Sequence, residues 1–489
     1  MLTFGIGNQD GEQVTGAMIR TRLGDFAKVA RCPARYGARL SQAFSATDPS
    51  VTVLAEDIQT VDDKRALDNS LFTDGVGTIT PDTALLIWEA YTMSRSRRSR
   101  RAIRPPSAFQ VRLGGCKGVF SVDYTRSGNR VYIRDSMEKF DAPDSLDIEI
   151  AKAFDKPTPG FLNRPLIMLL ETLGLEKSIF LELQRAAVKA TEEAVKSLGT
   201  ASELLEGHGL GTSFSLKSVF NSMARMGADL DTQDDMWPFL KHVLSFCANH
   251  VLRDLKYRAR IPIPNGVMLV GVADEYDLLQ EGQIYGECLF TEDIPQLLTV
   301  RIACTQVHRG RKKYIKGPVL ISRSPTVAPG DARMVMAIGE PEDGTPTAIY
   351  KNHTNCVIFA CKGSRSLPSM LAGGDLDGDE YLLITDERLH PPRQEPPLAY
   401  GEPQLDKLNR DATIDDVADF VVNYINNDIL GVIATQQLIM ADKSDKLLGD
   451  ENCKRLAGRS FVTTSYDIVL RVIQSYILLL LISPRPGGM

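Results

Sequence analysis

The chain has 489 residues, of which 62 are acidic and 56 are basic, so its formal net charge is −6. With 43% apolar and 24% charged residues, the composition is typical of a folded protein of about three domains and excludes a disordered tail. The acidic balance also excludes a uniformly basic nucleic-acid binder, although it is compatible with a local basic groove.

Short apolar runs separated by turn residues predict a first β module over residues 51–140, after an N-terminal segment, 1–50, that we expect to be partly helical. These runs are Val51–Leu54, Phe109–Val111, Val119–Val122 and Val131–Ile133. A helical connector is predicted over 141–257, because apolar residues recur at helical spacing between Leu166 and Leu198.

A second β module is predicted over 258–400, where short strand-like runs return between Gly, Pro and Asp turns. Its runs are Val267–Val272, Leu298–Ile302, Val319–Ile321, Met334–Ile338, Val357–Ala360 and Tyr381–Ile384. The remainder, 401–489, is expected to hold a partial helical region. The order β, α, β, α indicates an α+β fold with two β modules joined by a helical connector.

The eight cysteines are scattered without a CxxC pair, which predicts reduced thiols and neither a disulfide framework nor a zinc site. The N-terminus lacks the pattern of a signal peptide, and the longest apolar run is too short to span a bilayer. We therefore expect a soluble, intracellular protein without a membrane partner, with nucleus and cytoplasm both left open.

An acidic segment carries Asp375, Asp377 and Asp379 at alternate positions. A flat strand would set these side chains about 6.6 Å apart per step, and a helix would turn the middle one away from the other two. Only a tight loop brings the three together, and we expect Gly374 and Gly378 to form it by taking positive φ. Clustered carboxylates repel one another unless a cation neutralises them, so the segment predicts a site for a hard ion, Mg²⁺ or Mn²⁺.

A solvated turn is the plain alternative for an acidic run, but strand-like runs on both sides place this one between core elements. An EF-hand loop also begins with alternating aspartates, yet it needs glycine at its sixth position and glutamate at its twelfth, where this sequence has Glu380 and Asp386. A magnesium site for phosphoryl chemistry fits the pattern best.

The segment Gly373–Asp379 resembles the catalytic signature of the eukaryotic, fungal-type RNA-dependent RNA polymerases of RNA silencing. Six further blocks resemble that family in the family's order: Phe72–Gly77, Phe109–Gly118, Arg134–Phe140, Phe161–Arg164, Val272–Leu279 and Arg323–Asp331. One such block would be weak support, whereas seven in register favour the family strongly. The resemblance implies two double-psi β-barrel modules joined by helices.

By the resemblance, Asp375, Asp377 and Asp379 hold the catalytic Mg²⁺, and the 3′-hydroxyl of a growing RNA attacks the α-phosphate of an incoming nucleoside triphosphate. Lys117 and Lys139 occupy the positions of the family's first-barrel lysines, which face the metal site and neutralise phosphate oxygens. An exposed lysine without a catalytic role remains the alternative for each of the two.

Arg323 and Arg333 are candidates for contacting the triphosphate or the template, and pairing with Asp331 inside the scaffold is the equal alternative. A basic cluster is compatible with an RNA-tracking surface and equally with a solvated hairpin tip; its members are Arg309, Arg311, Lys312, Lys313 and Lys316. The basic run from Arg95 to Arg104 favours a surface loop.

Two departures from the family pattern, Ala328 in place of a histidine and Cys116 in place of an aromatic residue, leave the aspartates unchanged. Beyond about residue 460 the sequence no longer resembles the family's helical continuation, so we expect a truncated product or a faulty gene model. The implied helical region is then only partly present.

The sequence thus predicts an RNA-directed RNA polymerase, a nucleotidyltransferase that copies single-stranded RNA into double-stranded RNA for RNA silencing. The implied partners are a single-stranded RNA template, NTPs and, by family analogy, Dicer or Argonaute pathway proteins. A truncated, non-catalytic RNA-binding fragment of such a polymerase is the main alternative. A Mg²⁺-dependent phosphodiesterase and a DNA-directed transcriptase are further rivals.

Overall fold

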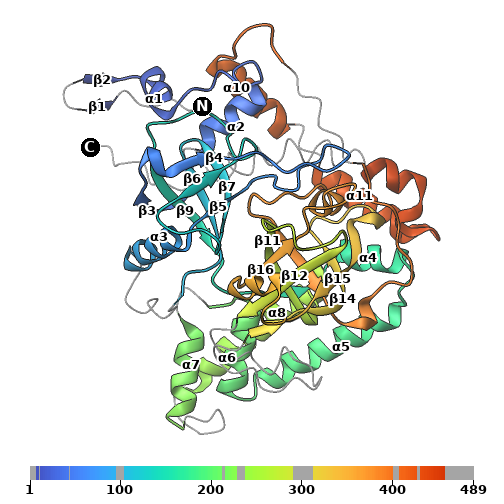
Figure 1. Ribbon diagram of the computed structural model, residues 1–489. Coiled ribbons are helices and arrows are strands. Elements are labelled where there is room, and N and C mark those ends of the chain that lie inside the picture. Colours follow the sequence, from blue (N-terminus) through green and yellow to red (C-terminus); the bar gives the residue numbers. More distant parts are fainter. Residues whose placement is uncertain are drawn as a thin grey trace, which may run out of the picture.

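Two large β-sheets lie next to each other, and most of the helices cover the second one (Figure 1). The computed structural model describes residues 7–9, 12–42, 44–94, 104–211, 215–227, 237–289, 312–399, 407–426 and 430–457. The mixed α and β architecture, with a sheet in each predicted β module, agrees with the α+β class expected from the sequence.

The first sheet has seven strands in the order β3-β9-β6-β7-β5-β8-β4. The strands are β3 (Asp48–Thr52), β4 (Ile58–Thr60), β5 (Val76–Ile79), β6 (Ala108–Leu113), β7 (Cys116–Val122), β8 (Val131–Ile133) and β9 (Asp147–Ala153). Helix α3 (Pro81–Ser94) covers the apolar face, where Ile87 and Trp88 pack with Phe109 and Phe120 of the strands. The apolar residues on this face form a hydrophobic cluster that is separate from the clusters of the second sheet.

The second sheet closes on itself. Its strands are β10 (Thr158–Phe161), β11 (Pro262–Ala273), β12 (Gln283–Leu289), β13 (Lys312–Tyr314), β14 (Lys316–Ser322), β15 (Ala332–Ile338), β16 (Cys356–Phe359) and β17 (Glu380–Ile384). The order β11-β16-β12-β15-β14-β17 is completed by a pairing of β17 with β11, so six strands form a ring. β10 and β13 pair outside the ring.

A run of helices follows β10 in the sequence: α4 (Arg164–Thr172), α5 (Lys177–Ala194), α6 (Leu198–Gly207), α7 (Leu216–Arg225) and α8 (Trp237–Arg258). Helices α4, α5 and α8 pack on the outside of the ring, whereas α7 packs against α6. Leu169 of α4, Leu183 of α5 and Val251 of α8 share one buried cluster with Leu320 and Ile384 of the ring. The apolar spacing noted in the sequence is therefore the face that these helices bury.

Shorter elements flank the two sheets. At the N-terminal end lie β1 (Gly7–Gln9), β2 (Glu12–Val14), α1 (Gly16–Leu23) and α2 (Pro33–Gln42), and near the C-terminal end lie α9 (Leu367–Met370), α10 (Ile414–Asn426) and α11 (Leu430–Lys443). Helix α10 packs against α2, although about 400 positions separate them in the sequence; a Cβ atom added at Gly37 would lie 2.9 Å from Val417. Helix α10 thus lies against α2 beside the first sheet (Figure 1).

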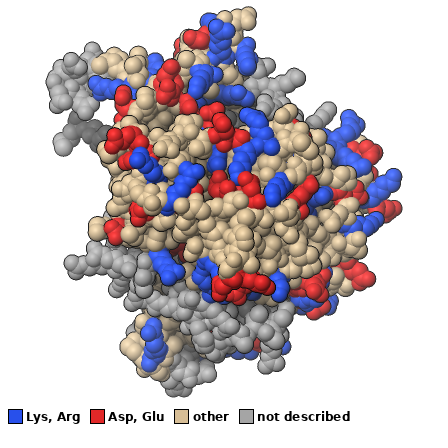
Figure 2. All heavy atoms as spheres, viewed as in Figure 1, with Lys and Arg blue, Asp and Glu red and all other residues tan. Residues whose placement is uncertain are grey.

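Both sheets contribute to one hydrophobic core. Val76, Ala108 and Val119 of the first sheet belong to the same buried cluster as Val272 and Tyr381 of the second. Burial of apolar area is the main source of attraction between packed layers, so this shared cluster holds the two sheets together. On the face shown in Figure 2, acidic and basic side chains are intermingled.

The structure differs from the sequence-based elements at several points. The helical part begins at α4, later than the expected 141, because β9 and β10 first add a strand to each sheet. Helix α3 was not expected inside the first β module, since its apolar residues lie on several sides and show little helical periodicity. The predicted strand Leu298–Ile302 and the segment after residue 460 lie outside the described residues.

None of the helices in the described part of the chain is long and apolar enough to cross a membrane. The double-psi topology implied by the family resemblance remains a prediction for both sheets.

Candidate active site between the two sheets

The acidic loop lies between α9 and β17, at the edge of the ring that faces the first sheet. Leu376 anchors it: its side chain is buried in the shared core, and its backbone N–H donates to the carbonyl of Asp74, 2.8 Å away. The hydroxyl of Tyr381 donates to the carbonyl of Asp375 at 2.7 Å, and Gln110 Nε2 donates to the carbonyl of Asp377 at 2.9 Å. Groups from both sheets therefore hold the loop backbone.

The carboxylates of Asp375 and Asp379 also accept hydrogen bonds from the loop's own backbone. Asp375 Oδ1 accepts from the N–H of Asp377 at 3.2 Å, and Asp379 Oδ2 accepts from the N–H of Asp375 at 3.1 Å. These hydrogen bonds wrap the segment into the tight loop that the alternating carboxylates required.

The glycines of the loop act differently from our expectation. Gly378 has the expected positive φ of +131°, but Gly374 does not, and the left-handed turn is made by Ala372 and Gly373 instead. Gly374 is needed for space, because a Cβ atom there would lie 2.7 Å from Cδ of Arg323. The prediction of positive φ at Gly374 was wrong, since spacing alone does not say which backbone position turns.

The first sheet approaches the loop so closely that only glycine fits at Gly75. A Cβ atom at this residue would lie 2.6 Å from Cβ of Asp377, and its φ is +80°. Gly128 has the same φ of +80° but nothing within 4 Å of its added Cβ atom. The two positions therefore separate backbone strain from steric contact with the acidic loop.

We expect Gly75→Ala to lower the free energy of unfolding by about 1–3 kcal/mol more than Gly128→Ala. Both substitutions put a side chain at positive φ, but only the one at Gly75 forces a methyl group against Asp377 of the acidic loop. Denaturant unfolding of both variants checks this difference. Equal losses of unfolding free energy in the two variants would mean that the acidic loop moves aside at Gly75 at no cost.

Lys117 is the cation from the first sheet that contacts the loop. It lies on β7, and its Nζ is 2.6 Å from Oδ2 of Asp377, with both side chains mostly buried. Burial by itself raises the pKa of Asp377, but Lys117, with smaller contributions from Lys139 and Arg112, lowers that pKa below its usual range. The acidic loop of one sheet and a basic strand of the other thus form one electrostatic unit.

Lys139 lies beside Lys117 without touching the aspartates. Its backbone N–H donates to the carbonyl of Gly115, two residues before Lys117, and its Nζ donates to the carbonyl of Ser136 at 2.5 Å. Burial and then the charge of Arg39 lower the pKa of Lys139, while the charge of Asp377 opposes them. This ammonium group therefore lies within the field of the loop.

Arg323, which directly follows β14 of the second sheet, pairs with an aspartate of the loop. Its Nε forms an ion pair with Oδ2 of Asp379 at 2.5 Å, and its Nη2 donates to Oδ1 at 3.1 Å. Burial lowers the pKa of Arg323, but the charge of Asp379 outweighs it and raises the pKa. Arg323 thus holds a carboxylate of the predicted site.

Arg333 is placed elsewhere. It lies on β15, donates from Nη1 to the carbonyl of Glu395 at 2.9 Å, and lines a cavity of about 120 Å³ together with Lys362 and Arg365. Burial and then the charge of Arg365 lower its pKa. The structure therefore brings Arg323 to the loop and does not show Arg333 there.

The predicted RNA-tracking cluster is only partly described, because Arg309 and Arg311 lie outside the described residues. Lys312 pairs with the buried Glu287 at 2.9 Å, and Lys313 donates to Oδ1 of Asn265 at 2.9 Å. Both ammonium groups thus bond inside the protein. Most of the basic run from Arg95 also lies outside the described part.

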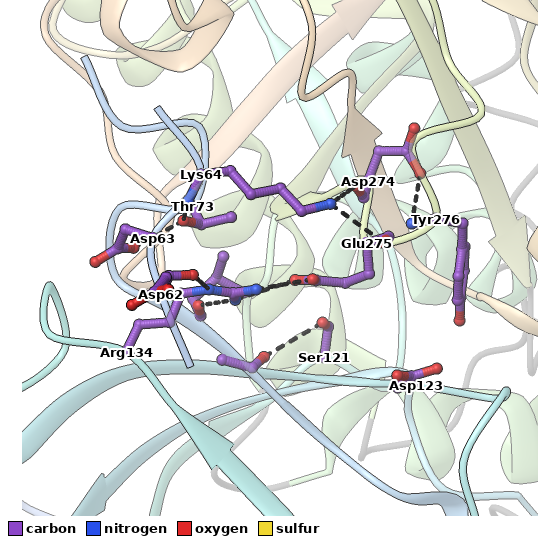
Figure 3. Close-up of polar contacts among 12 residues, drawn as sticks. Asp62, Asp63, Lys64, Thr73, Ser121, Asp123, Arg134, Asp274, Glu275 and Tyr276 are labelled. Carbon is purple, nitrogen blue, oxygen red and sulfur yellow. Dashed lines mark hydrogen bonds and ion pairs between the residues drawn. The ribbon is translucent and has the colours of Figure 1, made fainter. Parts of the chain in front are cut away.

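A buried clamp fixes the distance between the sheets (Figure 3). Arg134, with 5% of its side chain exposed, donates from Nη1 and Nη2 to the two carboxylate oxygens of Glu275 at 3.1 and 2.8 Å. Nearby, Lys64 Nζ donates to the backbone carbonyls of Asp274 and Glu275 at 3.2 Å each. Bidentate arginine–carboxylate pairs set orientation as well as distance, so this clamp aligns the lysines with the acidic loop.

Hydrogen bonds of Ser136 link the clamp to the acidic loop. Ser136, two residues after Arg134, donates from its hydroxyl to Asp63 at 2.9 Å and accepts from the N–H of Gly75 at 3.1 Å. Gly75 is the residue against which Asp377 packs. Hydrogen bonds and packing therefore connect Arg134 to the aspartates.

Sequence reasoning missed four side chains that surround the loop: Asp74, Gln110, Arg112 and Arg39. Asp74 raises the pKa of Asp375, after burial and the charges of Asp377 and Asp379, to well above its usual range. The first three lie within blocks already quoted for the family resemblance, so that signal was present in the sequence. Arg39 lies on α2, where no motif indicated a role.

Opposed carboxylates and cations, held by two sheets, are suited to phosphate groups and divalent ions. Comparisons with known proteins agree with a protein that handles phosphate groups and divalent ions. The family model for RNA dependent RNA polymerase matches residues 1–461, so the chain belongs to the RNA-dependent RNA polymerase family.

Relatives from plants and yeast support this assignment. The chain is 32% identical over 439 residues to the probable RNA-dependent RNA polymerase 1 of Oryza sativa, covering 90% of this chain and 54% of the relative. It is also 32% identical over 444 residues to RNA-dependent RNA polymerase 1 of Schizosaccharomyces pombe, covering 87% of this chain and 34% of the relative. The chain therefore spans about half or less of the length of these relatives.

The fold is also known. The chain is similar to the RNA dependent RNA polymerase QDE-1 from Thielavia terrestris, with a TM-score of 0.67 and 18% identity. The similarity covers 97% of this chain and 53% of that protein. At this identity the likeness establishes the fold alone.

Proposed function

We propose that this chain is an RNA-directed RNA polymerase core that copies single-stranded RNA into double-stranded RNA from NTPs. The observation that carries the proposal is the 2.6 Å contact between Lys117 of the first sheet and Asp377 of the second. That contact unites the two motifs that the family resemblance assigns to catalysis, although 260 positions separate them. Family membership supports the same conclusion.

The acidic loop fits a hard divalent cation, Mg²⁺ or Mn²⁺, in the chemistry of its donors. Asp375, Asp377 and Asp379 offer only carboxylate oxygens, the ligands that these ions favour. Asp375 also has a pKa raised well above its usual range, by burial first and then by the charges of Asp377 and Asp379, as expected for buried carboxylates that lie close together. Among the described residues, however, no three acidic, histidine or cysteine side chains converge closely enough to hold a metal ion.

The ion pairs explain why the carboxylates do not converge. Asp377 is turned to Lys117 and Asp379 to Arg323, so two of the three are bonded to protein cations. We propose that the three aspartates hold the ion when it binds. A divalent ion bound there would help to activate the attacking hydroxyl and to stabilise the leaving pyrophosphate.

The chain's own residues have separate tasks in this proposal. Lys117 and Lys139 neutralise phosphate oxygens of the substrate, since a compact ammonium group suits that role. Arg323 orients the carboxylate of Asp379 through two contacts. The clamp of Arg134 and Glu275 keeps the lysines opposite the loop.

The wider context is proposed by analogy with the family. The ring of six strands and the first sheet would be the two double-psi β-barrels that the resemblance implies. The double-stranded product would enter RNA silencing, with Dicer or Argonaute pathway proteins as partners.

The proposal is tested with the purified chain, a single-stranded RNA template, labelled NTPs and Mg²⁺. We expect label in a product that a nuclease specific for double-stranded RNA digests, and none when the RNA template is omitted. Incorporation that prefers a DNA template would indicate a DNA-directed enzyme. Shortening of RNA without NTPs would indicate a phosphodiesterase, and RNA binding without incorporation would indicate a non-catalytic fragment; each of these results would contradict the proposal.

A further inference from the structure

One face of β6 is turned toward the acidic loop. Along β6 the residues alternate between buried and partly exposed, and Gln110 and Arg112 share the partly exposed side. Gln110 Nε2 donates to the carbonyl of Asp377 at 2.9 Å, so this side faces the loop. Arg112 is also paired directly across from Lys117 on β7, the residue that contacts Asp377.

This placement puts two positive charges side by side. Directly opposed side chains of an antiparallel pair have Cβ atoms about 5 Å apart, and like charges there are destabilising. The charge of Asp377 is already engaged by Lys117. Among the residues that the structure describes, no carboxylate forms an ion pair with Arg112 beside the loop.

The guanidinium groups of Arg112 and Arg39 also hold unused hydrogen-bond donors. Nη1 of Arg112 donates to the carbonyl of Val111 at 2.9 Å, but its Nε is buried without an acceptor. Nε of Arg39, on α2, is likewise buried without an acceptor, and within the described residues the side chain of Arg39 has no hydrogen bond or ion pair. A buried polar group without a partner costs about 1–3 kcal/mol, and more when it is charged.

Helix α2 brings Arg39 to the same place. Gln42, three residues later and therefore on the same side of the helix, donates from Nε2 to the carbonyl of Gly115 at 3.2 Å, two residues before Lys117. Burial, followed by the charge of Arg35, lowers the pKa of Arg39, whereas the charge of Asp377 raises it. The charge of Asp377 thus acts on Arg39 of α2 and on Arg112 of β6.

A purely structural role for Arg112 would require pairing with Glu149, its neighbour across from β6 on β9. The Oγ1 hydroxyl of Thr47 donates to Oε2 of Glu149 at 2.7 Å, and the ion pairs among the described residues do not include Arg112 with Glu149. An anion that binds from outside would meet the Nη groups of these arginines, because their Nε atoms are buried.

We infer that Arg39 and Arg112 form a phosphate-binding pair beside Lys117, and that they bind a phosphate group of the RNA strand or of the incoming NTP. Guanidinium groups bind phosphate through two parallel N–H donors. The inference rests on the proposed polymerase function for the source of the phosphate. It adds a recognition role for two residues outside the aspartates and lysines.

The test measures binding, so it does not depend on turnover. A short single-stranded RNA is titrated in EDTA at several salt concentrations against wild type, Arg112→Gln, Arg39→Gln and the double variant. Binding of ATP with Mg²⁺ is measured in parallel. Arg185→Gln is the matched control, because Arg185 is an exposed arginine on α5.

If the phosphate belongs to RNA, each single variant should bind RNA about 10-fold more weakly, and the slope of log affinity against log salt should fall by about 0.7. If the phosphate belongs to NTP, ATP binding should weaken by about 10-fold and the RNA slope should not change. Arg112→Lys keeps the positive charge but loses the two parallel N–H donors. If the phosphate belongs to RNA, this variant should restore the wild-type salt slope.

The inference is overturned if the double variant, shown to be folded by its unfolding midpoint, binds both RNA and ATP like the control. If Arg112→Gln does not fold, Arg39→Gln on α2 decides by the same criteria. Wild-type protein that binds RNA but incorporates no NTP would contradict the proposed function, while the binding series would still decide the phosphate pair.

Discussion

Replacing Asp379 by alanine is expected to lower template-dependent NTP incorporation by about 10³-fold or more, because the change removes a charged ligand from the centre that stabilises the transition state. Asp379 accepts from the backbone of Asp375 and pairs with Arg323, so it also shapes the loop. Asp379→Asn keeps the volume of the side chain and removes only the charge. We expect a loss of the same order with this variant, measured by label incorporated at saturating NTP.

Asp343 offers a matched control, since 92% of its side chain is exposed and it pairs only at the surface with Lys351. Asp343→Ala should leave incorporation unchanged, because exposed ion pairs contribute little. Unchanged incorporation in Asp379→Ala would falsify the assignment of the three aspartates. Loss in Asp379→Ala with full activity in Asp379→Asn would assign Asp379 a role in loop shape and not in charge.

Arg134→Met should lower the free energy of unfolding by about 3–5 kcal/mol, because it leaves the carboxylate of Glu275 buried without its cation. Arg134 also donates to the carbonyl of Val76 at 2.7 Å, and that bond is lost with it. The double variant Arg134→Met/Glu275→Met should recover much of the loss, since two apolar side chains leave no lone charge. Denaturant unfolding of the single and double variants measures both effects.

An exposed pair of the same geometry provides the comparison. Arg410 donates from Nη1 and Nη2 to the two carboxylate oxygens of Asp416 at 2.6 and 2.9 Å, but 60% of the arginine side chain is exposed. Arg410→Met should therefore cost far less than Arg134→Met, because water replaces the lost partner. Equal costs for the two would show that burial does not govern the clamp.

Several features of the site were predictable because they depend on neighbouring residues. Three aspartates at alternate positions indicated a wrapped loop, and hydrogen bonds wrap the segment between α9 and β17, after the predicted strand β16. Apolar runs bounded by turn residues located the strands from β6 to β8 and from β14 to β17 for the same reason. Short-range spacing and the rules of backbone conformation suffice for such features.

The family blocks extended the prediction to Lys117 and Lys139, although an exposed lysine without a catalytic role remained the alternative for each. The structure shows that Lys117 contacts Asp377, while Lys139 donates to Ser136 and influences the loop only through its charge. It places Arg323 at Asp379 and Arg333 in a different cavity. A motif names candidate residues, but it does not state which of them meet.

The sequence by itself determined the acidic loop, the strand-like runs around it and membership of a polymerase family, because each of these is written in consecutive residues. Only the tertiary structure decided that Lys117 lies 2.6 Å from an aspartate 260 positions away, and that Arg134 and Glu275 join the two sheets. Such contacts depend on the pairing of distant strands and on the packing of both sheets into one core. Neither is encoded in local spacing, since many chain paths are compatible with the same short-range pattern.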